Sequence, residues 1–272
     1  MSTLSHVLRT AERIPIDRMS KIILMSDCHR GTGSRYDDFL KNRHIFAAAL
    51  TYYLQNGFTY MELGDGEELW ENRSATKIKE AHSDIYALME QFAQRGRLQI
   101  LYGNHDITKN CRKLGFENVS CRAGIVLCGA DNEIFLVHGH QGDIWNDSLW
   151  RVARFLVRYV WRPLETIGLQ NPTSTSSNTK RKNRTERRLS AWCTENGKLA
   201  VFGHTHRPVL PPPGQGLYCN CGSCVHPYCV TGIEIANGLI SLVRWTVKTN
   251  SENFLYVDKE TIAGPYDITL YH

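Results

Sequence analysis

The chain has 272 residues, of which 42% are hydrophobic and 22% charged, and its formal net charge is +5. This composition is typical of a globular protein and excludes disordered, collagen-like and coiled-coil chains. No segment approaches the roughly 18–20 uninterrupted apolar residues that a membrane-spanning helix needs. Arg9, Glu12 and Arg13 interrupt the apolar run that a signal peptide requires. The sequence therefore predicts a cytoplasmic protein with a single large domain, residues 1–272.

Short apolar segments with strand character recur along the chain, and each of them stops at a polar residue or a glycine. These segments are Lys21–Met25, Thr59–Leu63, Leu98–Tyr102, Glu133–Val137 and Lys198–Phe202. Helical patterns lie between the first three, at Phe39–Gln55 and about Lys77–Gln94. Near the C-terminus, residues 233–236 and 239–243 flank Asn237 and Gly238, which predicts a two-residue β-hairpin. The pattern indicates an α/β fold.

The predicted strands end at side chains that can bind metal ions. Ligands of α/β proteins bind at the carboxyl ends of the strands, so we expect these side chains to share one site. Carboxylate and imidazole together suit divalent metals such as Mn, Fe, Zn or Co. Residues two apart on an extended chain face the same way, so Asp27 and His29 can reach the site together, as can His204 and His206.

The same residues carry a resemblance to a known family. The segments at Asp27 to His29, Asp65, Asn104 to Asp106, His138 to His140 and His204 to His206 resemble five ordered motifs of calcineurin-like metallophosphoesterases. The resemblance implies a four-layer α/β-β/α sandwich that holds two divalent metal ions, most often Mn, Fe or Zn. It implies that one metal is bound by Asp27, His29 and His206, the other by Asn104, His138 and His204, and that Asp65 bridges them.

The resemblance also implies a reaction. A metal-bound hydroxide would attack phosphorus in line and hydrolyse a phosphoester or pyrophosphate bond. His105 would contact the phosphate and protonate the leaving oxygen, and Asp106 would help to fix that imidazole. Arg30 and His140 are further candidates for substrate binding, although Arg30 fits a solvated loop equally well. Glu68 is expected to order the loop or one of the ligands.

A basic, aromatic segment separates the fourth motif from the fifth. Ten Lys and Arg against two Glu give residues 148–190 a charge of 10 − 2 = +8, which leaves 5 − 8 = −3 for the rest of the chain. In residues 149–162, four arginines fall on one side of a helix that is otherwise mostly apolar. We interpret residues 148–190 as an inserted helical cap. It resembles the cap of the UDP-2,3-diacylglucosamine hydrolase branch, which covers an acyl-chain groove.

The second resemblance is partial, because His105 and His140 stand where that branch usually has Arg and Asp. The substrate is therefore expected to be a phosphorylated small molecule or lipid, with a UDP-diacylglucosamine-like lipid as one case. The segment 149–162 either packs on the domain or contacts an anionic membrane at its inner face, and nucleic acid is disfavoured. The alternative functions are a protein or nucleotide phosphatase or phosphodiesterase of the same superfamily, and a non-catalytic scaffold of this fold.

The nine cysteines fall into two sets. In a chain read as having no export signal, the scattered set is expected to be reduced thiols, with Cys28 pointing away from the metals because its neighbours point towards them. This set comprises Cys28, Cys111, Cys121, Cys128 and Cys193. The crowded set is interpreted as small buried thiols, with a zinc site or redox pairing as alternatives. It comprises Cys219, Cys221, Cys224 and Cys229.

Overall fold

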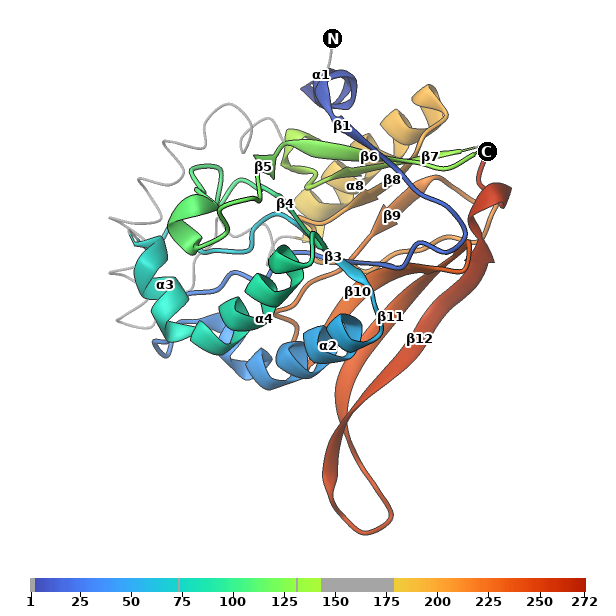
Figure 1. Ribbon diagram of the computed structural model, residues 1–272. Helices are drawn as coiled ribbons and strands as arrows, with labels where there is room; N and C mark the ends of the chain where they lie inside the picture. The colour runs from blue at the N-terminus through green and yellow to red at the C-terminus, as the bar shows by residue number, and fades with distance from the viewer. Residues whose placement is uncertain (1–2, 73, 131, 143–178) are drawn as a thin grey trace.

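Two β-sheets lie face to face at the centre of the molecule, and helices cover the outer face of each (Figure 1). The computed structural model describes residues 3–72, 74–130, 132–142 and 179–272. The larger sheet has the strand order β12-β11-β10-β2-β3-β4-β5, and the smaller has β1-β6-β7-β8-β9. This arrangement is the four-layer α/β-β/α sandwich that the sequence predicts.

The strands of the seven-stranded sheet are β2 (Ile22–Met25), β3 (Thr59–Leu63), β4 (Leu98–Leu101), β5 (Cys121–Arg122), β10 (Cys229–Ala236), β11 (Leu239–Thr249) and β12 (Leu255–Asp267). Those of the five-stranded sheet are β1 (Glu12–Pro15), β6 (Gly124–Cys128), β7 (Glu133–Val137), β8 (Leu199–Phe202) and β9 (Tyr218–Asn220). The helices are α1 (Thr3–Thr10), α2 (Arg43–Gln55), α3 (Ala75–Ala81), α4 (Ser83–Gln94) and α8 (Thr179–Asn196). Short 3₁₀ helices occupy Asp38–Lys41, Arg112–Leu114, His140–Gly142 and Ile268–Leu270.

Parallel pairing brings the predicted strand ends together. In the larger sheet β2, β3 and β4 run parallel, so their carboxyl ends lie along one edge. In the smaller sheet β7 and β8 also run parallel. Every residue of β2 and β8 is buried, because both faces of each sheet are covered. Burial on both faces explains why these strands appear in the sequence as continuous apolar runs rather than as alternating ones.

Three hydrophobic cores separate the four layers. Leu24 and Leu136 belong to the core between the two sheets. Ile23, the neighbour of Leu24 along β2, faces the opposite way and packs with Phe46 under α2 and α4. Leu189 packs in the third core, between the five-stranded sheet and the helices α1 and α8. Alternate residues of one strand therefore serve two different cores.

The predicted helix at residues 77–94 is two helices, α3 and α4, which meet at His82. The backbone of His82 has φ −120° and ψ 37°, outside the helical range, so it interrupts the hydrogen-bond ladder. Its side chain explains the break, because Nε2 lies 2.8 Å from the carboxylate of Asp37 in the protein interior. A buried polar contact thus outweighs the helical pattern of the sequence.

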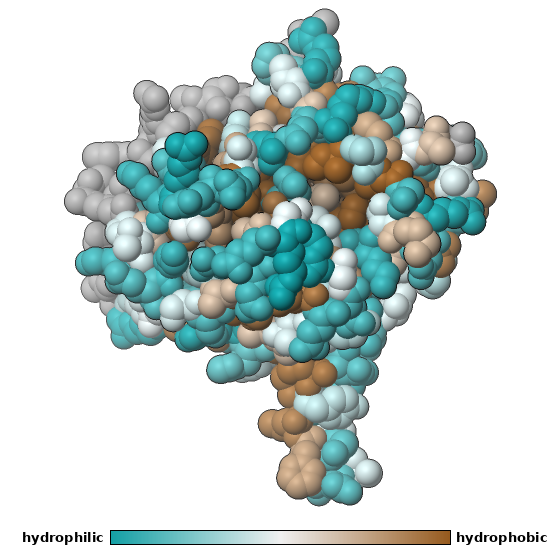
Figure 2. All heavy atoms as spheres, viewed as in Figure 1, coloured by the Kyte–Doolittle hydropathy of each residue, from teal (hydrophilic) through white to brown (hydrophobic). Residues whose placement is uncertain are grey.

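The predicted C-terminal hairpin is present, and a second hairpin follows it. β10 and β11 pair through Asn237 and Gly238, both with positive φ, as the sequence predicts. β11 then continues beyond the body of the molecule and returns as β12, which forms a long projecting hairpin (Figure 1). Figure 2 shows apolar residues along this projection, which include the exposed side chains of Val247 and Leu255. β12 is not among the elements that the sequence pattern predicts.

Cys111 and Cys121 form a disulfide, so the prediction that all the scattered cysteines are reduced is wrong for this pair. The bond joins Cys111, just before the 3₁₀ helix Arg112–Leu114, to Cys121 in β5. The two cysteines are ten residues apart in the sequence. Cys28 is free and packs in the core under α2 and α4, away from the ends of the strands, as predicted.

The four crowded cysteines do not converge. Cys219 and Cys221 lie in the core between the sheets, whereas Cys224 packs on the opposite side of the seven-stranded sheet and Cys229 is partly exposed. In the described part of the chain, no group of residues with metal-binding geometry contains a cysteine. Burial raises the pKa of the Cys221 and Cys224 thiols well above the ordinary value, which disfavours the thiolate that zinc requires. Cys219, Cys221 and Cys224 are therefore small buried thiols, as predicted, whereas Cys229 is not fully buried.

Residues 149–162, the predicted basic helix, lie outside the described residues, as does the cap up to residue 178. The described end of the cap, residues 179–190, is the first part of α8. None of the helices that the structure describes is long and apolar enough to cross a lipid bilayer. The cap as a separate segment and its contact with a membrane therefore stay predictions.

Candidate metal centre

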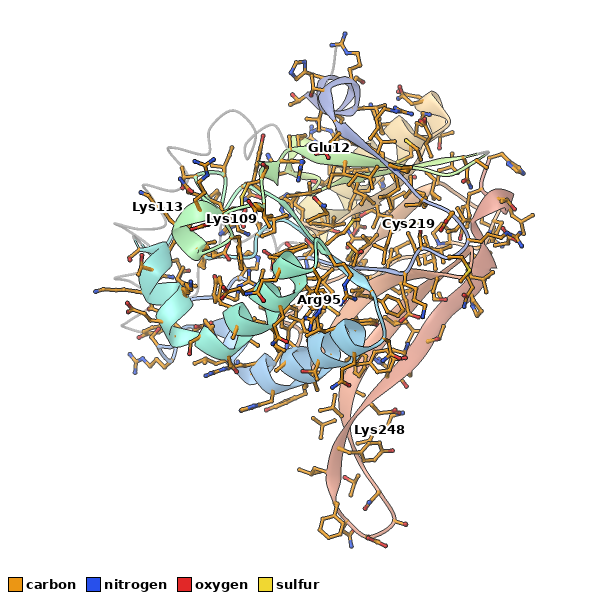
Figure 3. The ribbon with its side chains drawn as sticks, viewed as in Figure 1. Glu12, Arg95, Lys109, Lys113, Cys219 and Lys248 are labelled. Carbon is orange, nitrogen blue, oxygen red and sulfur yellow. A yellow bond between two sulfur atoms is a disulfide. The ribbon has the colours of Figure 1, made fainter. Side chains whose placement is uncertain are left out.

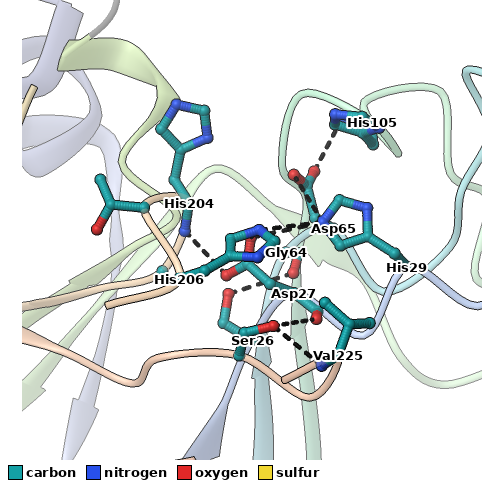
Figure 4. A network of polar contacts seen from close by, with 12 residues as sticks. Ser26, Asp27, His29, Gly64, Asp65, His105, His204, His206 and Val225 are labelled. Atoms are coloured by element: carbon teal, nitrogen blue, oxygen red, sulfur yellow. Dashed lines mark hydrogen bonds and ion pairs between the residues drawn. The ribbon is translucent and has the colours of Figure 1, made fainter. Parts of the chain in front are cut away.

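The carboxyl ends of five strands, three from the larger sheet and two from the smaller, meet at one place. Figure 4 shows side chains from the loops after β2, β3, β4 and β8 gathered there. The loops that follow β2, β3 and β4 carry carboxylate, amide and imidazole groups, and those that follow β7 and β8 carry imidazoles. The predicted residues that gather there are Asp27, His29, Asp65, Asn104, His105, His138, His140, His204 and His206.

The chain reaches the site through left-handed backbone rather than through extended strand. Such conformations are uncommon for residues other than glycine and cost of order 1–3 kcal/mol each. They redirect the chain immediately after the strand, so the predicted meeting of Asp27 with His29 is present for a different reason than alternation along a strand. The residues concerned are Asp27 (φ 56°), His29 (φ 47°), Asp65 (φ 51°), His204 (φ 65°) and His206 (φ 58°).

Asp27, His29 and His206 form one group of donor atoms. His206 Nε2 lies 3.1 Å from Asp27 Oδ1 and 3.3 Å from His29 Nε2. His29 uses its other ring nitrogen, Nδ1, to donate a hydrogen bond to Glu68 at 2.9 Å. Nε2 of His29 is therefore turned towards the other two side chains, and it is the nitrogen that would coordinate a cation after losing its proton.

Asp65, His138 and His204 form a second group. His138 donates from Nδ1 to the carbonyl oxygen of Leu63 at 2.9 Å, which leaves Nε2 free to coordinate, and this atom lies 3.1 Å from Asp65 Oδ2. The same oxygen of Asp65 lies 4.0 Å from His29 Nε2. One carboxylate thus faces both donor groups.

Asn104 and His140 are both buried beside these groups. Asn104 is 1% exposed and its Oδ1 makes no hydrogen bond, an arrangement that is costly unless the oxygen binds a cation. His140 belongs to neither donor group, and its ring centroid lies 5.6 Å from that of His138. Burial and the nearby His138 lower the pKa of His140 to about 3, so its imidazole is neutral.

The charges of the site act on its side chains in two directions. Burial lowers the pKa of His29, for example, but hydrogen bonds to Asp27 and Glu68 raise it well above the ordinary value. Burial alone would raise the pKa of Asp27, but His206 and His138 beside it lower that pKa well below the ordinary value. Burial and the neighbouring His138 lower the pKa of His204 well below its ordinary value. Burial acts in the same direction on His138, but Asp65 and Asp27 raise its pKa to about 9. A bound cation would displace that proton, because coordination needs the neutral imidazole.

Glu68 and Trp70 hold the imidazole of His105. Glu68 accepts a hydrogen bond from His105 Nδ1 at 2.9 Å, and Trp70 stacks on the imidazole with ring centroids 4.1 Å apart. The indole N–H of Trp70 donates to the carbonyl oxygen of Asn104 at 2.6 Å. Burial would raise the pKa of Glu68, but His105 lowers it to about 2, so the carboxylate is ionised. The expectation that Glu68 orders a ligand is confirmed by its bond to His29.

Asp106 orders the loops instead of the imidazole, contrary to the prediction. It accepts hydrogen bonds from the backbone N–H groups of Gly103 at 2.6 Å, Asp65 at 3.2 Å and Gly66 at 2.9 Å. These bonds tie the loop after β4 to the loop after β3. Among the described residues, the carboxylate that contacts the imidazole is that of Glu68.

Arg30 is fully buried, so the prediction that it contacts a substrate phosphate is wrong. Its guanidinium lies 2.8 Å from Glu62 and 2.8 Å from Glu67. Lys109, labelled in Figure 3, joins the same network, with Nζ 2.8 Å from Glu62, 2.6 Å from Glu67 and 3.1 Å from Asp106. The two cationic side chains thus compensate the charge of two of the three carboxylates in this network. Through its contact with Lys109, the network also holds the Asp106 side chain in place.

Comparisons with known proteins agree with this geometry. The model of the calcineurin-like phosphoesterase family matches residues 20–208, a range that contains every strand-end motif. No curated protein sequence matches the chain.

Similar solved structures include a conserved uncharacterised protein of Streptococcus pneumoniae, described as a predicted phosphoesterase. It is 16% identical over 89% of this chain and 97% of that chain, with a TM-score of 0.40. Vps29 of Chaetomium thermophilum is 12% identical over 90% of this chain and 96% of its own, with a TM-score of 0.44. A single mutant of Vps29 from Entamoeba histolytica is 13% identical over 89% and 99%, with a TM-score of 0.42. On the family match, the chain belongs to the calcineurin-like phosphoesterases.

Proposed function

We propose that the protein is a phosphoesterase that binds two divalent cations, Mn, Fe or Zn, and hydrolyses a phosphoester or pyrophosphate bond. The observation that supports this most directly is the position of Asp65, whose Oδ2 lies 3.1 Å from His138 Nε2 and 4.0 Å from His29 Nε2. The buried Asn104 Oδ1 without a hydrogen bond fits a ligand of the second cation. Cations bound there supply Lewis acidity and a hydroxide nucleophile at neutral pH.

The residues around His105 prepare it to move a proton. Because Nδ1–H of His105 donates to Glu68, the ring presents Nε2 as the atom that can give a proton to the leaving oxygen. Trp70 covers one face of the imidazole and limits its rotation. Asp106 fixes the backbone of the loops that carry Asp65 and His105.

Asp65→Asn tests this proposal. Metal content would be measured by inductively coupled plasma mass spectrometry, and hydrolysis would be followed with bis(4-nitrophenyl) phosphate in the presence of Mn. We expect two metal ions per wild-type chain, and in the variant a loss of metal and of at least 100-fold in kcat/KM, the scale of a removed electrostatic stabiliser. Asp38→Asn, which removes an exposed carboxylate, is the control. Wild-type protein that holds no metal, together with unchanged activity of Asp65→Asn, would favour the scaffold alternative.

The lipid substrate is a separate proposal that rests on the sequence of residues 148–190. The metal-loaded protein would be incubated with UDP-2,3-diacylglucosamine and with water-soluble phosphoesters, and the products identified by mass spectrometry. Release of UMP from the acylated substrate alone supports the lipid reading, and turnover of the soluble esters alone refutes it. Contact with anionic membranes is tested by charge reversal at Arg154 and Arg158, which should weaken sedimentation with anionic vesicles.

A further inference from the structure

The beginning of α8 lies at the metal centre. The helix ends at Asn196, the chain turns at Gly197 (φ 56°), and β8 starts at Leu199, so the helix and the strand run in opposite directions. β8 leads into His204 and His206 at its carboxyl end. The first turns of α8 therefore lie beside that end of the strand, and the hydrogen bond from Arg207 Nη1 to Asn183 Oδ1, 3.0 Å long, confirms this.

Lys182 lies on the side of α8 that faces the sheet. It is seven residues before Leu189, which places the two within about 20° of each other around the helix. Leu189 is fully buried and Thr185, one turn after Lys182, is 3% exposed, whereas Lys182 is partly buried. Lysine is rarely found on a buried stripe. At this level β8 has ended, and the helix lies beside the loop that carries His204 and His206.

Lys182 makes no ion pair of its own, because the carboxylate one turn further along α8, Glu186, is paired with another residue. Arg207, which follows His206 in the chain, is paired with Glu186 at 2.8 Å. Lys182 forms no ion pair with any residue in the described ranges. Burial and the nearby Arg207 lower the pKa of Lys182, while Glu186 and Asp27 act in the opposite direction. Arg207 follows His206 and Asn183 follows Lys182, so the hydrogen bond between Arg207 and Asn183 brings Lys182 close to the first donor group.

We propose that Lys182 binds a second anionic group of the substrate, next to the phosphate that is cleaved. This inference rests on the proposed function and narrows the substrate class to diphosphates and other phosphoesters that carry an adjacent anion. An ammonium that is partly buried and makes no ion pair gains a charge-assisted hydrogen bond when such a group arrives. A simple phosphodiester gives Lys182 no partner, and its binding depends on the metal ligands alone.

The test compares two phosphonates and three variants. Methylenebisphosphonate, a diphosphate analogue that is not hydrolysed, and methylphosphonate would be titrated into Mn-loaded protein by calorimetry. We expect Lys182→Gln to weaken binding of methylenebisphosphonate roughly tenfold or more, the scale of one hydrogen bond to a charged group, and to leave methylphosphonate unchanged. Lys182→Arg should keep most of the affinity. The matched control is Arg187→Gln, an exposed position about 140° away on the same helix.

Equal weakening of both phosphonates, or the same loss in Arg187→Gln, would overturn the inference, because either result indicates a general effect of charge. Hydrolysis of UDP-glucose and of bis(4-nitrophenyl) phosphate separates this result from the proposed function. If neither ester is hydrolysed by the wild-type protein, the phosphoesterase proposal fails, and the calorimetry still decides whether Lys182 recognises the second phosphonate. If both are hydrolysed and Lys182→Gln keeps the wild-type kcat/KM for each, the inference fails and the proposed function stands.

Discussion

The side chains of Glu68 and His105 are joined by a hydrogen bond of 2.9 Å between Oε1 and Nδ1. The other carboxylate oxygen, Oε2, accepts a hydrogen bond from Nδ1 of His29 at the same distance. A single carboxylate thus fixes the tautomer of two imidazoles, one in the first donor group and one proposed to move a proton. The position of a metal ligand and the position of the proton donor therefore depend on the same residue.

Replacing Glu68 should weaken both proton transfer and metal binding, because the same carboxylate holds His105 and His29. Glu68→Gln keeps a side-chain oxygen for one hydrogen bond but removes the negative charge, so His105 is no longer held as a proton donor. We expect kcat at saturating metal to fall by about 100-fold, the lower end for general acid catalysis, and metal affinity to fall by about 10-fold or more, because His29 loses the charge of its partner. Steady-state kinetics and metal analysis of the same samples measure this, with the exposed Glu80→Gln as control. An unchanged kcat would contradict the role assigned to Glu68.

The buried network beneath the site should respond strongly to the loss of one cation. Lys109→Met leaves Glu62, Glu67 and Asp106 with only Arg30 to compensate three carboxylates. Breaking a buried ion pair in this way costs about 3–5 kcal/mol of unfolding free energy. Urea denaturation at constant m-value measures the difference.

The matched control for this network is Lys113→Met, because Lys113 lies in the same segment of the chain but is exposed (Figure 3). We expect it to change the unfolding free energy by less than about 0.5 kcal/mol, as surface substitutions usually do. Equal effects of the two substitutions would show that the Lys109 network does not stabilise the fold.

The contact between Asp37 and His82 should make stability depend on pH. Burial would raise the pKa of Asp37, but hydrogen bonds from His82 and from the backbone of Gly33 lower it. A carboxyl group with a lowered pKa in the folded state stabilises the fold above its unfolded pKa of about 3.9, and that contribution is lost as the pH falls through the folded pKa. The stability difference between wild type and Asp37→Asn should therefore shrink from pH 7 to pH 3. Urea denaturation at both pH values measures it, and a constant difference would argue against the contact.

The disulfide makes a prediction that needs no substitution. Cys111 and Cys121 are bonded and seven cysteines are free. Denatured protein that has not been reduced should therefore react with Ellman's reagent at seven thiols, and reduced protein at all nine. Nine reactive thiols without reduction would show that Cys111 and Cys121 are reduced, as the sequence predicts for the scattered cysteines.

The ligand residues could be predicted because each signal is local. The apolar run of β2 stops just before Asp27 and that of β3 just before Asp65. One short segment of sequence therefore reveals both the strand and the candidate ligand at its end. The partner of His105 could not be predicted in this way. Asp106 is its neighbour in the chain, yet Glu68, 37 residues away, contacts the imidazole, because the loops after β3 and β4 meet only in the folded sheet.

Arg30 and β12 show two further limits. Arg30 follows a metal ligand directly, but its side chain turns into the interior towards Glu62 and Glu67, and that distant pairing leaves no local pattern. β12 is an edge strand in which none of the 13 residues is fully buried. An exposed strand need not carry the alternation of apolar and polar residues that reveals a strand in sequence.

The origin of the ligands has a consequence for stability. Asp27 and His29 follow a strand of the larger sheet, and His206 follows a strand of the smaller one. A cation held by these three residues would cross-link the two sheets. It would do so at the carboxyl ends of the strands, where the site must stay open to the substrate. At a concentration 100 times its dissociation constant, such a cation would add about 2.7 kcal/mol to the free energy of unfolding. The atoms proposed to perform the chemistry would then also keep the two sheets closed together.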